Sequence, residues 1–329
     1  MKKIKPLKEY STEASKKVYK HIYADVERFM QMKMKLRDIS TLVYYNIKDE
    51  LKGRSILDIG CGYGRFCLMA AQSAERVVGV DMTAQAIEVA KILQKALNDD
   101  KVEFILSEAN DVNLKEVFDY IYLGGILEHI IDPDSIMKTI DRLLCKGGKL
   151  LMDCPAEFNF RGIISTAFWK LFNFPMTLTD VRVVTLSFIE ELAKKHEYEL
   201  IKVSGYGYSR GWSEMAYKDL EHRMSQVLKD VNDKIQMVDV DKKSFDSWVL
   251  EITNHYSKLL DDWKQREILK PIPVREEVIF NEDVLRDNNM PVKVVKEFFG
   301  QDIMTEPYYS DVYPYNTIGS VGIYILRKK

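Results

Sequence analysis

The sequence lacks an excess of either charge. Its 48 basic residues nearly match its 50 acidic ones, and the formal net charge is -2. Proteins that bind nucleic acid through their overall charge are strongly basic, so such binding would need a local patch here. We therefore expect no nucleic-acid partner.

Cysteine is also scarce, with four residues among 329. No two of them form a Cys-x-x-Cys pair, and no histidine stands near them at the spacing of metal ligands. Each lies in or beside an apolar run. We therefore expect no metal site, a cytoplasmic location, and reduced, buried thiols at Cys61, Cys67, Cys145 and Cys154.

Long hydrophobic runs are missing as well. No stretch of about 18 uncharged apolar residues, the length that a membrane-spanning helix needs, occurs in the chain. The nearest approach, 158–174, is rich in aromatic residues but is interrupted by Arg161 and Lys170. We expect no stable membrane insertion.

What the sequence does contain is a regular alternation of short apolar segments and amphipathic ones. Such alternation is typical of parallel βαβ units with helices on both faces of one sheet. It predicts an α/β fold: a doubly wound, mostly parallel seven-stranded sheet with N-terminal helices and a largely helical insertion before the last strand. The expected strands are 55–60, 76–81, 102–106, 118–123, 149–153, 199–205 and 321–326.

The same pattern divides the chain into three units. Residues 1–52 are expected to form an N-terminal helical segment. Residues 53–210 and 318–329 are expected to form the sheet domain. Residues 211–317 are charged and mainly helical in pattern, and we interpret them as an insertion that covers a substrate or forms an interface.

One helix start carries a signal of its own. Ser187 followed by Glu190 is the pattern of a capping box, in which each side chain bonds a backbone N–H near the other. The pattern predicts a helix from 187 to about 196, just before the sixth strand.

The most informative segment follows the first expected strand. Gly60, Gly62 and Gly64 stand at alternate positions, where glycine lets the chain turn sharply and lets a ligand approach. Asp81 ends the second strand, and an acid there can accept hydrogen bonds from both hydroxyls of a ribose. The spacing is Gly-x-Gly-x-Gly, unlike the Gly-x-Gly-x-x-Gly of dinucleotide sites, and Asp58 precedes it. A carboxylate beside the loop suits a cationic ligand better than a pyrophosphate.

With these motifs the sequence resembles the class I methyltransferases, which are Rossmann-like, seven-stranded and dependent on S-adenosylmethionine. Residues 102–109 resemble their third-strand motif, in which an acid contacts adenine, and Glu108 occupies that place. Residues 118–133 resemble the fourth-strand motif, in the Leu-Glu-His form that is common in enzymes methylating small molecules. The resemblance covers about 53–206 and the last strand.

The resemblance implies S-adenosyl-L-methionine as the cofactor. It implies a small molecule as the substrate and leaves a homodimer open. The cofactor-binding residues that we predict on this basis are Asp58, Gly60, Cys61, Gly62, Gly64, Asp81, Met82, Glu108, Ala109, Leu123 and Gly124.

Two neighbouring residues after the fourth strand are the candidate catalytic residues. His129 is the candidate general base, because imidazole titrates near neutrality and a hydroxyl acceptor must lose its proton. The other interpretation is that His129 caps or packs the helix that follows. Glu128 could orient His129, bind an amine, or serve as an acid at a helix start.

The sequence leaves three functions open. The first is methyl transfer to an oxygen, nitrogen or carbon of a small molecule, such as a sugar or a quinone-like metabolite. The second is a protein-directed methyltransferase whose insertion binds its partner, and the third is a non-catalytic scaffold or cofactor sensor. The loop spacing disfavours an oxidoreductase that uses a nicotinamide cofactor, and no Asn-Pro-Pro-Tyr-like motif supports a nucleic-acid methyltransferase.

Aromatic residues raise a further question about substrate. The stretch 158–174 either forms a lid over an apolar or planar substrate or packs against the insertion as core. The tyrosines of 308–315 allow the same two interpretations. Tyr10, Tyr19 and Tyr23 precede the first strand and are candidates to close over the cofactor.

Overall fold

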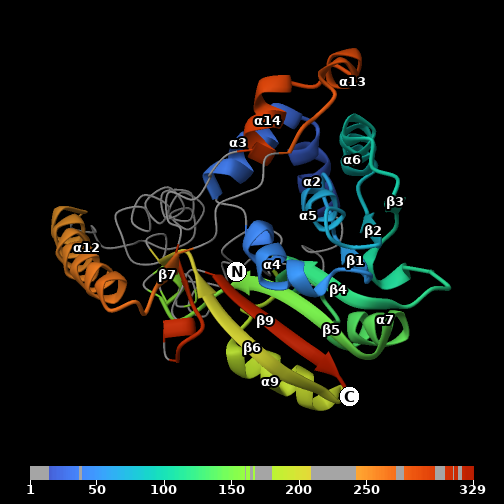
Figure 1. Cartoon of the computed structure of the whole chain (residues 1–329). Helices are drawn as coiled ribbons and strands as arrows, with labels where there is room; N and C mark the ends of the chain where they lie inside the picture. The colour runs from blue at the N-terminus through green and yellow to red at the C-terminus, as the bar shows by residue number, and fades with distance from the viewer. Residues whose placement is uncertain are drawn as a thin grey trace, which may run out of the picture.

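One mixed sheet runs through the middle of the molecule (Figure 1). The computed structural model describes residues 15–36, 39–159, 161–163, 166, 180–208, 242–271, 278–300, 308–313, 315–317 and 321–329. Within these residues the sheet has nine strands in the order β3-β2-β1-β4-β5-β9-β6-β8-β7. The strands are β1 (Ser55–Ile59), β2 (Arg76–Asp81), β3 (Val102–Leu106), β4 (Phe118–Gly124), β5 (Leu144–Pro155), β6 (Tyr198–Tyr206), β7 (Lys270–Pro271), β8 (Tyr308–Ser310) and β9 (Val321–Lys328).

The predicted mostly parallel sheet is confirmed. Strands β1 to β5 lie parallel to one another, and β9 runs antiparallel between β5 and β6. The predicted count of seven is too low, because β7 and β8 extend the edge beyond β6. Both added strands come from the expected helical insertion. A strand of two or three residues is too short to show the alternation by which a sequence reveals a strand.

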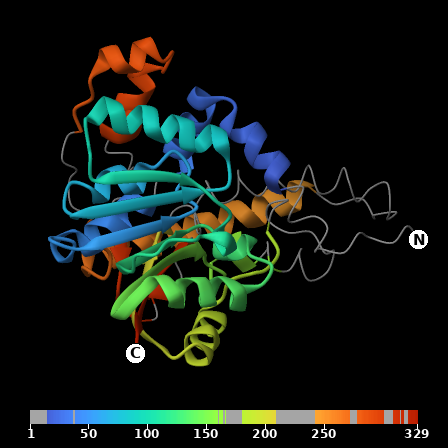
Figure 2. The same cartoon turned by 90° about the vertical axis from the view of Figure 1, so that its right-hand side faces the viewer.

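Side chains of each strand point alternately to two separate hydrophobic cores. Ile56 of β1 and Val77 of β2 lie in the core that includes α4, α5 and α6, whereas Leu57 and Val78 lie in the core that includes α7 and α9. Figure 2 shows helices on both sides of the sheet, as a doubly wound fold requires. These helices are α4 (Ile39–Ile47), α5 (Arg65–Ala70), α6 (Ala84–Leu97), α7 (Pro133–Leu143) and α9 (Leu186–Lys195).

Helices from both ends of the chain add to one of these faces. Helix α14 packs on α3, and α13 packs on α6 (Figure 1). Leu285, Val295 and Phe299 are buried in the same core as α4 to α6, so part of the expected insertion adjoins the sheet domain. The division into three units stays a prediction. The added helices are α2 (Ser15–Tyr23), α3 (Val26–Leu36), α12 (Lys242–Gln265), α13 (Glu282–Asp287) and α14 (Val292–Gly300).

Helix α9 begins earlier than the predicted capping box allows. Its N-cap is Thr185, whose hydroxyl oxygen accepts a hydrogen bond of 3.0 Å from the backbone N–H of Phe188. Ser187 instead lies inside the first turn, with its hydroxyl 2.9 Å from that of Thr185. The prediction of a capping box that begins at Ser187 was therefore wrong, because Thr185, two positions earlier, takes the capping role.

The cysteines of the chain are free. Cys61, Cys67 and Cys154 are buried, as predicted, whereas Cys145 is only half-buried. Burial raises the pKa of the Cys61 thiol to about 11, which disfavours the reactive thiolate. Among the described residues, no three His, Cys, Asp or Glu side chains are grouped to hold a metal ion. No helix in the described part of the chain is long and apolar enough to cross a membrane.

Candidate functional site

The glycine loop after β1 needs glycine at its first and last positions. Gly60 and Gly64 have φ values of +83° and +72°, in the left-handed region that other residues avoid. A Cβ atom on Gly60 would lie 2.3 Å from Cδ1 of Ile126, and one on Gly64 would lie 2.3 Å from Cζ of Phe104. The backbone N–H of Gly60 donates to the carbonyl oxygen of Val80 at 2.7 Å. The loop is thereby fixed against the end of β2.

Asp81 is placed where β2 ends, beside the loop. It is buried, and its two carboxylate oxygens accept hydrogen bonds from the backbone N–H of Gly62 at 3.0 Å and of Thr83 at 2.8 Å. Burial raises the pKa of Asp81, while these two backbone donors oppose the rise. A buried carboxylate at this edge can accept hydrogen bonds from the hydroxyl groups of a ribose.

A cavity of about 250 Å³ opens beside Asp81, at the carboxyl ends of β1 to β4. This is the edge at which parallel α/β sheets bind ligands. The cavity brings together residues that come from distant parts of the sequence. The predicted residues that line it are Gly60, Asp81, Met82, Glu108, Ala109, Gly124 and His129.

Other predicted residues do not line this cavity. Asp58 is buried within β1, and its carboxylate accepts a hydrogen bond of 3.3 Å from the thiol of Cys67. Glu128 lines a smaller hollow next to the cavity. The remaining predicted residues belong to the glycine loop or to β4 and do not line the cavity; they are Cys61, Gly62, Gly64 and Leu123.

The sequence analysis also missed some residues of the cavity. Thr83, Ser107 and Asn110 add polar groups, and each directly follows or adjoins a predicted residue. Their position next to the motif residues was the available signal. Apolar side chains on the segment after β4 complete the wall, and they are Ile126, Ile130 and Ile131.

Two of the three candidate tyrosines of the N-terminal segment line the cavity. Tyr19 and Tyr23 of α2 stack with ring centroids 6.1 Å apart, and the hydroxyl of Tyr63 donates to the carbonyl oxygen of Tyr23 at 2.9 Å. Burial, followed by the charge of Asp81, raises the pKa of Tyr23 well above its ordinary value. Helix α2 therefore contributes a neutral aromatic wall beside Asp81. Tyr10 lies outside the described residues.

His129 also lines the cavity, from the short 3₁₀ helix η4 (Leu127–His129). Its Nε2 lies 3.9 Å from Oε1 of Glu128, and its Nδ1 lies 3.3 Å from Oδ1 of Asp180. The ring of Tyr19 meets the imidazole edge-on, with centroids 6.0 Å apart and an angle of 74°. The side chains of His129, Glu128 and Asp180 are all largely buried. Nothing in the local sequence around His129 indicated Asp180, which lies far along the chain.

The segment that carries Asp180 is tied to the η4 region by hydrogen bonds. The backbone N–H of Val181 donates to the carbonyl oxygen of Glu128 at 2.8 Å. The guanidinium of Arg182 donates to the carbonyl oxygens of Ile130, at 2.6 Å, and of Ile131, at 2.7 Å. These hydrogen bonds reach carbonyl oxygens just before and just after His129 in the sequence, so they fix the position of Asp180 relative to His129.

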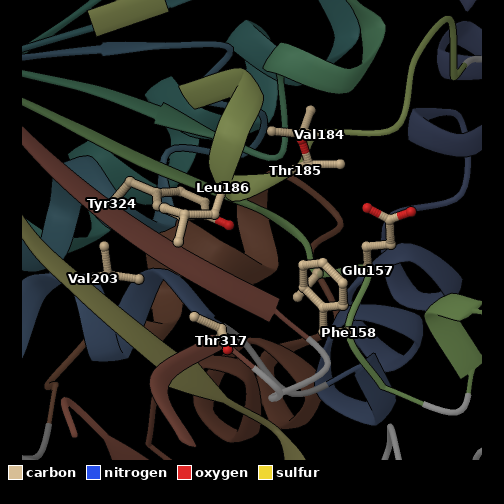
Figure 3. Close-up of a pocket in the computed structure, with 9 residues that line it drawn as sticks. Glu157, Phe158, Val184, Thr185, Leu186, Val203, Thr317 and Tyr324 are labelled. Atoms are coloured by element: carbon tan, nitrogen blue, oxygen red, sulfur yellow. The ribbon is translucent and has the colours of Figure 1, made fainter. Parts of the chain in front are cut away.

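Two hollows beyond Glu128 are too small for a cofactor. One has a volume of about 30 Å³ and the other about 10 Å³, which is room for roughly one water molecule. Figure 3 shows the smaller hollow, with Leu186 and Tyr324 on one side and Glu157 and Phe158 on the other. Phe158 is 52% exposed, and most of the aromatic stretch 158–174 lies outside the described residues. The lid interpretation therefore stays a prediction.

The chemistry of the large cavity fits a positively charged nucleoside cofactor. The carboxylates of Asp81 and Glu108 both line it, and a Cβ on Gly60 would be blocked by Ile126, another wall residue. Carboxylates can accept hydrogen bonds from the hydroxyl and amino groups of an adenosine, and their negative charge favours a cationic ligand over a phosphate. The fold and this site define a nucleoside-binding α/β domain suited to a cationic ligand.

Comparison with known proteins shows which proteins this part of the chain is similar to. Residues 50–203 match a family described as "Methyltransferase domain". The ubiquinone biosynthesis O-methyltransferase of Xanthomonas oryzae pv. oryzae (strain PXO99A) is 29% identical over 125 residues, 36% of this chain and 51% of that one. The protein of the same name from Coxiella burnetii (strain Dugway 5J108-111) is 33% identical over 131 residues, 38% of this chain and 53% of that one. The chain thus spans about half the length of these curated relatives.

Residues 50–203 are therefore similar to a methyltransferase domain. Solved structures with a similar fold include the YcgJ protein from Bacillus subtilis, with 16% identity and a TM-score of 0.49 over 88% of this chain and 98% of that one. Another is phosphoethanolamine N-methyltransferase 2 from Haemonchus contortus in complex with S-adenosyl-L-methionine. It has 18% identity and a TM-score of 0.45 over 88% of this chain and 52% of that one.

Proposed function

We propose that the protein transfers the methyl group of S-adenosylmethionine to a hydroxyl group of a small molecule. The observation that carries this proposal is that His129, a candidate base, lines the same cavity as Asp81, the candidate ribose acceptor. The relatives from Xanthomonas oryzae and Coxiella burnetii support the proposal, because both are named as O-methyltransferases. A quinone-like phenol is accordingly the first acceptor class to test.

In this proposal, one wall of the cavity holds the cofactor. Asp81 accepts hydrogen bonds from the ribose hydroxyls, Glu108 contacts the adenine, and Gly60 lines the cavity between them and Ile126. When bound, S-adenosylmethionine supplies a methyl group on a positively charged sulfur. Tyr19 and Tyr23 cover this side and reduce the access of water. Excluding water and aligning the two reactants are the main tasks of the protein in such a transfer.

His129, which also lines the cavity, acts on the acceptor. Its imidazole accepts the proton of the hydroxyl group as the oxygen–methyl bond forms. The carboxylates of Glu128 and Asp180 lie 3.9 Å and 3.3 Å from its two nitrogens, so they stabilise the imidazolium that results. Two carboxylates at this place also disfavour an acceptor that is itself an anion.

The first test measures cofactor binding by calorimetric titration with S-adenosylhomocysteine, with NAD as the control. We expect the former alone to bind. Binding of NAD alone would overturn the proposal, and binding of neither would favour a non-catalytic scaffold.

The second test measures transfer of a radiolabelled methyl group to a catechol, a primary amine and an unfolded protein. We expect the catechol to be methylated. We also expect His129→Gln to abolish most of this transfer while retaining S-adenosylhomocysteine binding. Labelling of the protein alone would favour the protein-directed alternative, and full activity of His129→Gln would refute the base.

A further inference from the structure

The two carboxylates beside His129 are not equivalent. Asp180 approaches Nδ1 at 3.3 Å, an ion-pair distance without the geometry of a hydrogen bond, whereas Glu128 is farther away, at 3.9 Å from Nε2. Glu128 is also the immediate neighbour of His129 on the same 3₁₀ turn. Asp180 comes from a different segment, so it can hold the imidazole against rotation.

The surroundings of Asp180 are built to keep it in place. Its side chain is 8% exposed. The next residue, Val181, bonds the backbone of Glu128 at 2.8 Å, and Arg182 bonds the carbonyl oxygens of Ile130 and Ile131. These bonds lie on both sides of His129 in the sequence. A carboxylate that is fixed in this way can select one tautomer of a neighbouring imidazole.

We propose that Asp180 is a positioning residue for His129. As the nearer of the two carboxylates, Asp180 favours the proton of the neutral imidazole on Nδ1 through its negative charge, which leaves the lone pair on Nε2 to accept the proton of the substrate hydroxyl. As the bond between oxygen and methyl forms and the bond between sulfur and methyl breaks, that proton moves to Nε2. The imidazolium then carries one proton on each nitrogen, and Asp180 stabilises its charge until the Nε2 proton passes to solvent. The role in catalysis rests on the proposed function.

Several groups face the imidazole and contribute to its titration. They are Glu128 on the same turn, Asp180 on the segment before α9, and the ring of Tyr19 on α2. Asp81 and Glu108 line the same cavity. A substitution at Asp180 alone leaves all the others in place, so its effect reports on this one contact.

The chain offers a matched control in another Asp–His pair. Oδ1 of Asp134 lies 2.7 Å from Nε2 of His196, and Asp134 is half-exposed on α7. Neither residue lines the cavity. Asp134→Asn therefore makes the same chemical change beside a different histidine.

The experiment is ¹⁵N NMR of histidine-labelled protein with S-adenosylhomocysteine bound, followed over a range of pH. The signals of His129 are assigned as those lost in His129→Gln. In the unaltered protein we expect the neutral His129 to be protonated on Nδ1. In Asp180→Asn the amide oxygen can still accept the Nδ1 proton, so the tautomer should persist. The titration midpoint should fall by about one pH unit, because one negative charge is lost.

Three further variants complete the test. In Asp180→Ala, His129 should lose its preference for the Nδ1-protonated tautomer. In Asp180→Glu, which keeps the negative charge, the titration midpoint of His129 should return part of the way to its value in the unaltered protein. Asp134→Asn should leave the titration midpoint of His129 unchanged. The proposal is wrong if His129 keeps its midpoint in Asp180→Asn, or if neutral His129 carries its proton on Nε2.

This result is independent of turnover, and a thermal melt of each variant confirms that it is folded. An intact Nδ1 tautomer in a protein that methylates nothing would sink the proposed function but leave the pairing of Asp180 with His129. If methyl transfer depends on His129 but is unaffected in every Asp180 variant, the proposed function stands and the positioning role of Asp180 is wrong.

Discussion

Asp81 and Gly62 are joined by a hydrogen bond of 3.0 Å, which the backbone N–H of the glycine donates to the carboxylate. The other oxygen of the same carboxylate accepts from Thr83, at the start of α6. One buried side chain thus connects the glycine loop after β1 with the end of β2. Since this side chain also lines the cavity, the shape of the loop and the proposed binding of the ribose depend on the same residue.

Replacing Asp81 with alanine should therefore weaken cofactor binding. We expect the affinity for S-adenosylhomocysteine to fall at least about tenfold, because a hydrogen bond to a charged group contributes about 1.5–3 kcal/mol. Calorimetric titration measures this change. Asp119→Ala is the control, because Asp119 pairs with Arg54 and Ser55 at the amino end of β4. Equal affinities for the two variants would contradict the role of Asp81.

The same residue predicts how binding changes with pH. Burial raises the pKa of Asp81 above its ordinary value of 3.8. Ribose hydroxyls donate to the ionised form, so a proton competes with the ligand. Affinity for S-adenosylhomocysteine should be retained at neutral pH and lost as the pH falls through the raised pKa, at a pH above 3.8. In Asp81→Asn this loss should disappear, and a pH series of titrations on both proteins decides the point.

As the pH falls through the raised pKa of Asp81, the contribution of this residue to the stability of the free protein should rise, whereas the ligand affinity should fall. Because the pKa of this acid is raised by folding, the folded state holds the proton more tightly than the unfolded chain does. The cost of burying its charge is present above the raised pKa and is relieved as the pH falls. Ligand affinity that declined in parallel with the stability of the free protein would point to acid unfolding instead.

The parts of the site that could be predicted are those that local sequence determines. Gly60 needs a positive φ between a strand and a helix, and Asp81 ends a strand, so both were visible as patterns. Asp58 does not line the cavity, and the alternation of side chains along β1 already indicated the direction in which it points. Ile56 faces the core beside α5, and Asp58, two residues later, faces the same side and meets Cys67 of α5.

The rest of the site depends on contacts that no local pattern encodes. Asp180 reaches His129 only because the segment before α9 crosses the turn after β4. Tyr23 lines the cavity only because α2 folds back over the glycine loop. Such long-range placements follow from the packing of the whole chain, and a single sequence gives the residue types without the distances.

Substitution of Gly60 by alanine tests the close approach in the glycine loop. The φ of +83° and the distance of 2.3 Å to Ile126 should both oppose a Cβ atom. Gly53→Ala is the matched control, because Gly53 has a φ of +70° and no atom within 4 Å of the added Cβ. Gly53→Ala should lower the free energy of unfolding by about 1–2 kcal/mol. Gly60→Ala should lower it by about 1–3 kcal/mol more, from overpacking.

Denaturant unfolding of both variants gives these values. The additional destabilisation of Gly60→Ala relative to Gly53→Ala should depend on Ile126. A double-mutant cycle of Gly60→Ala with Ile126→Ala should therefore show a coupling energy. If Gly60→Ala costs no more than Gly53→Ala, the contact with Ile126 is not a constraint on the loop.

Arg65 links the cofactor loop to the far end of the chain. It follows Gly64 directly, is 5% exposed, and lies with its guanidinium carbon 4.4 Å from the ring centroid of Phe298 on α14. Its Nη2 also donates to the hydroxyl of Thr41 on α4 at 3.4 Å. We expect Arg65→Ala to lower the free energy of unfolding by about 2–3 kcal/mol, from lost packing and a lost cation–π contact.

The control for this variant is Arg54→Ala. Arg54 is exposed and forms a surface ion pair of 3.0 Å with Asp119, so its loss should cost less than about 1 kcal/mol. Arg65→Ala and Phe298→Ala should be strongly coupled in a double-mutant cycle, since each removes the same contact. Additive effects would mean that α14 does not support the helix after the glycine loop. Coupled effects would show that this part of the 211–317 segment stabilises the methyltransferase domain itself.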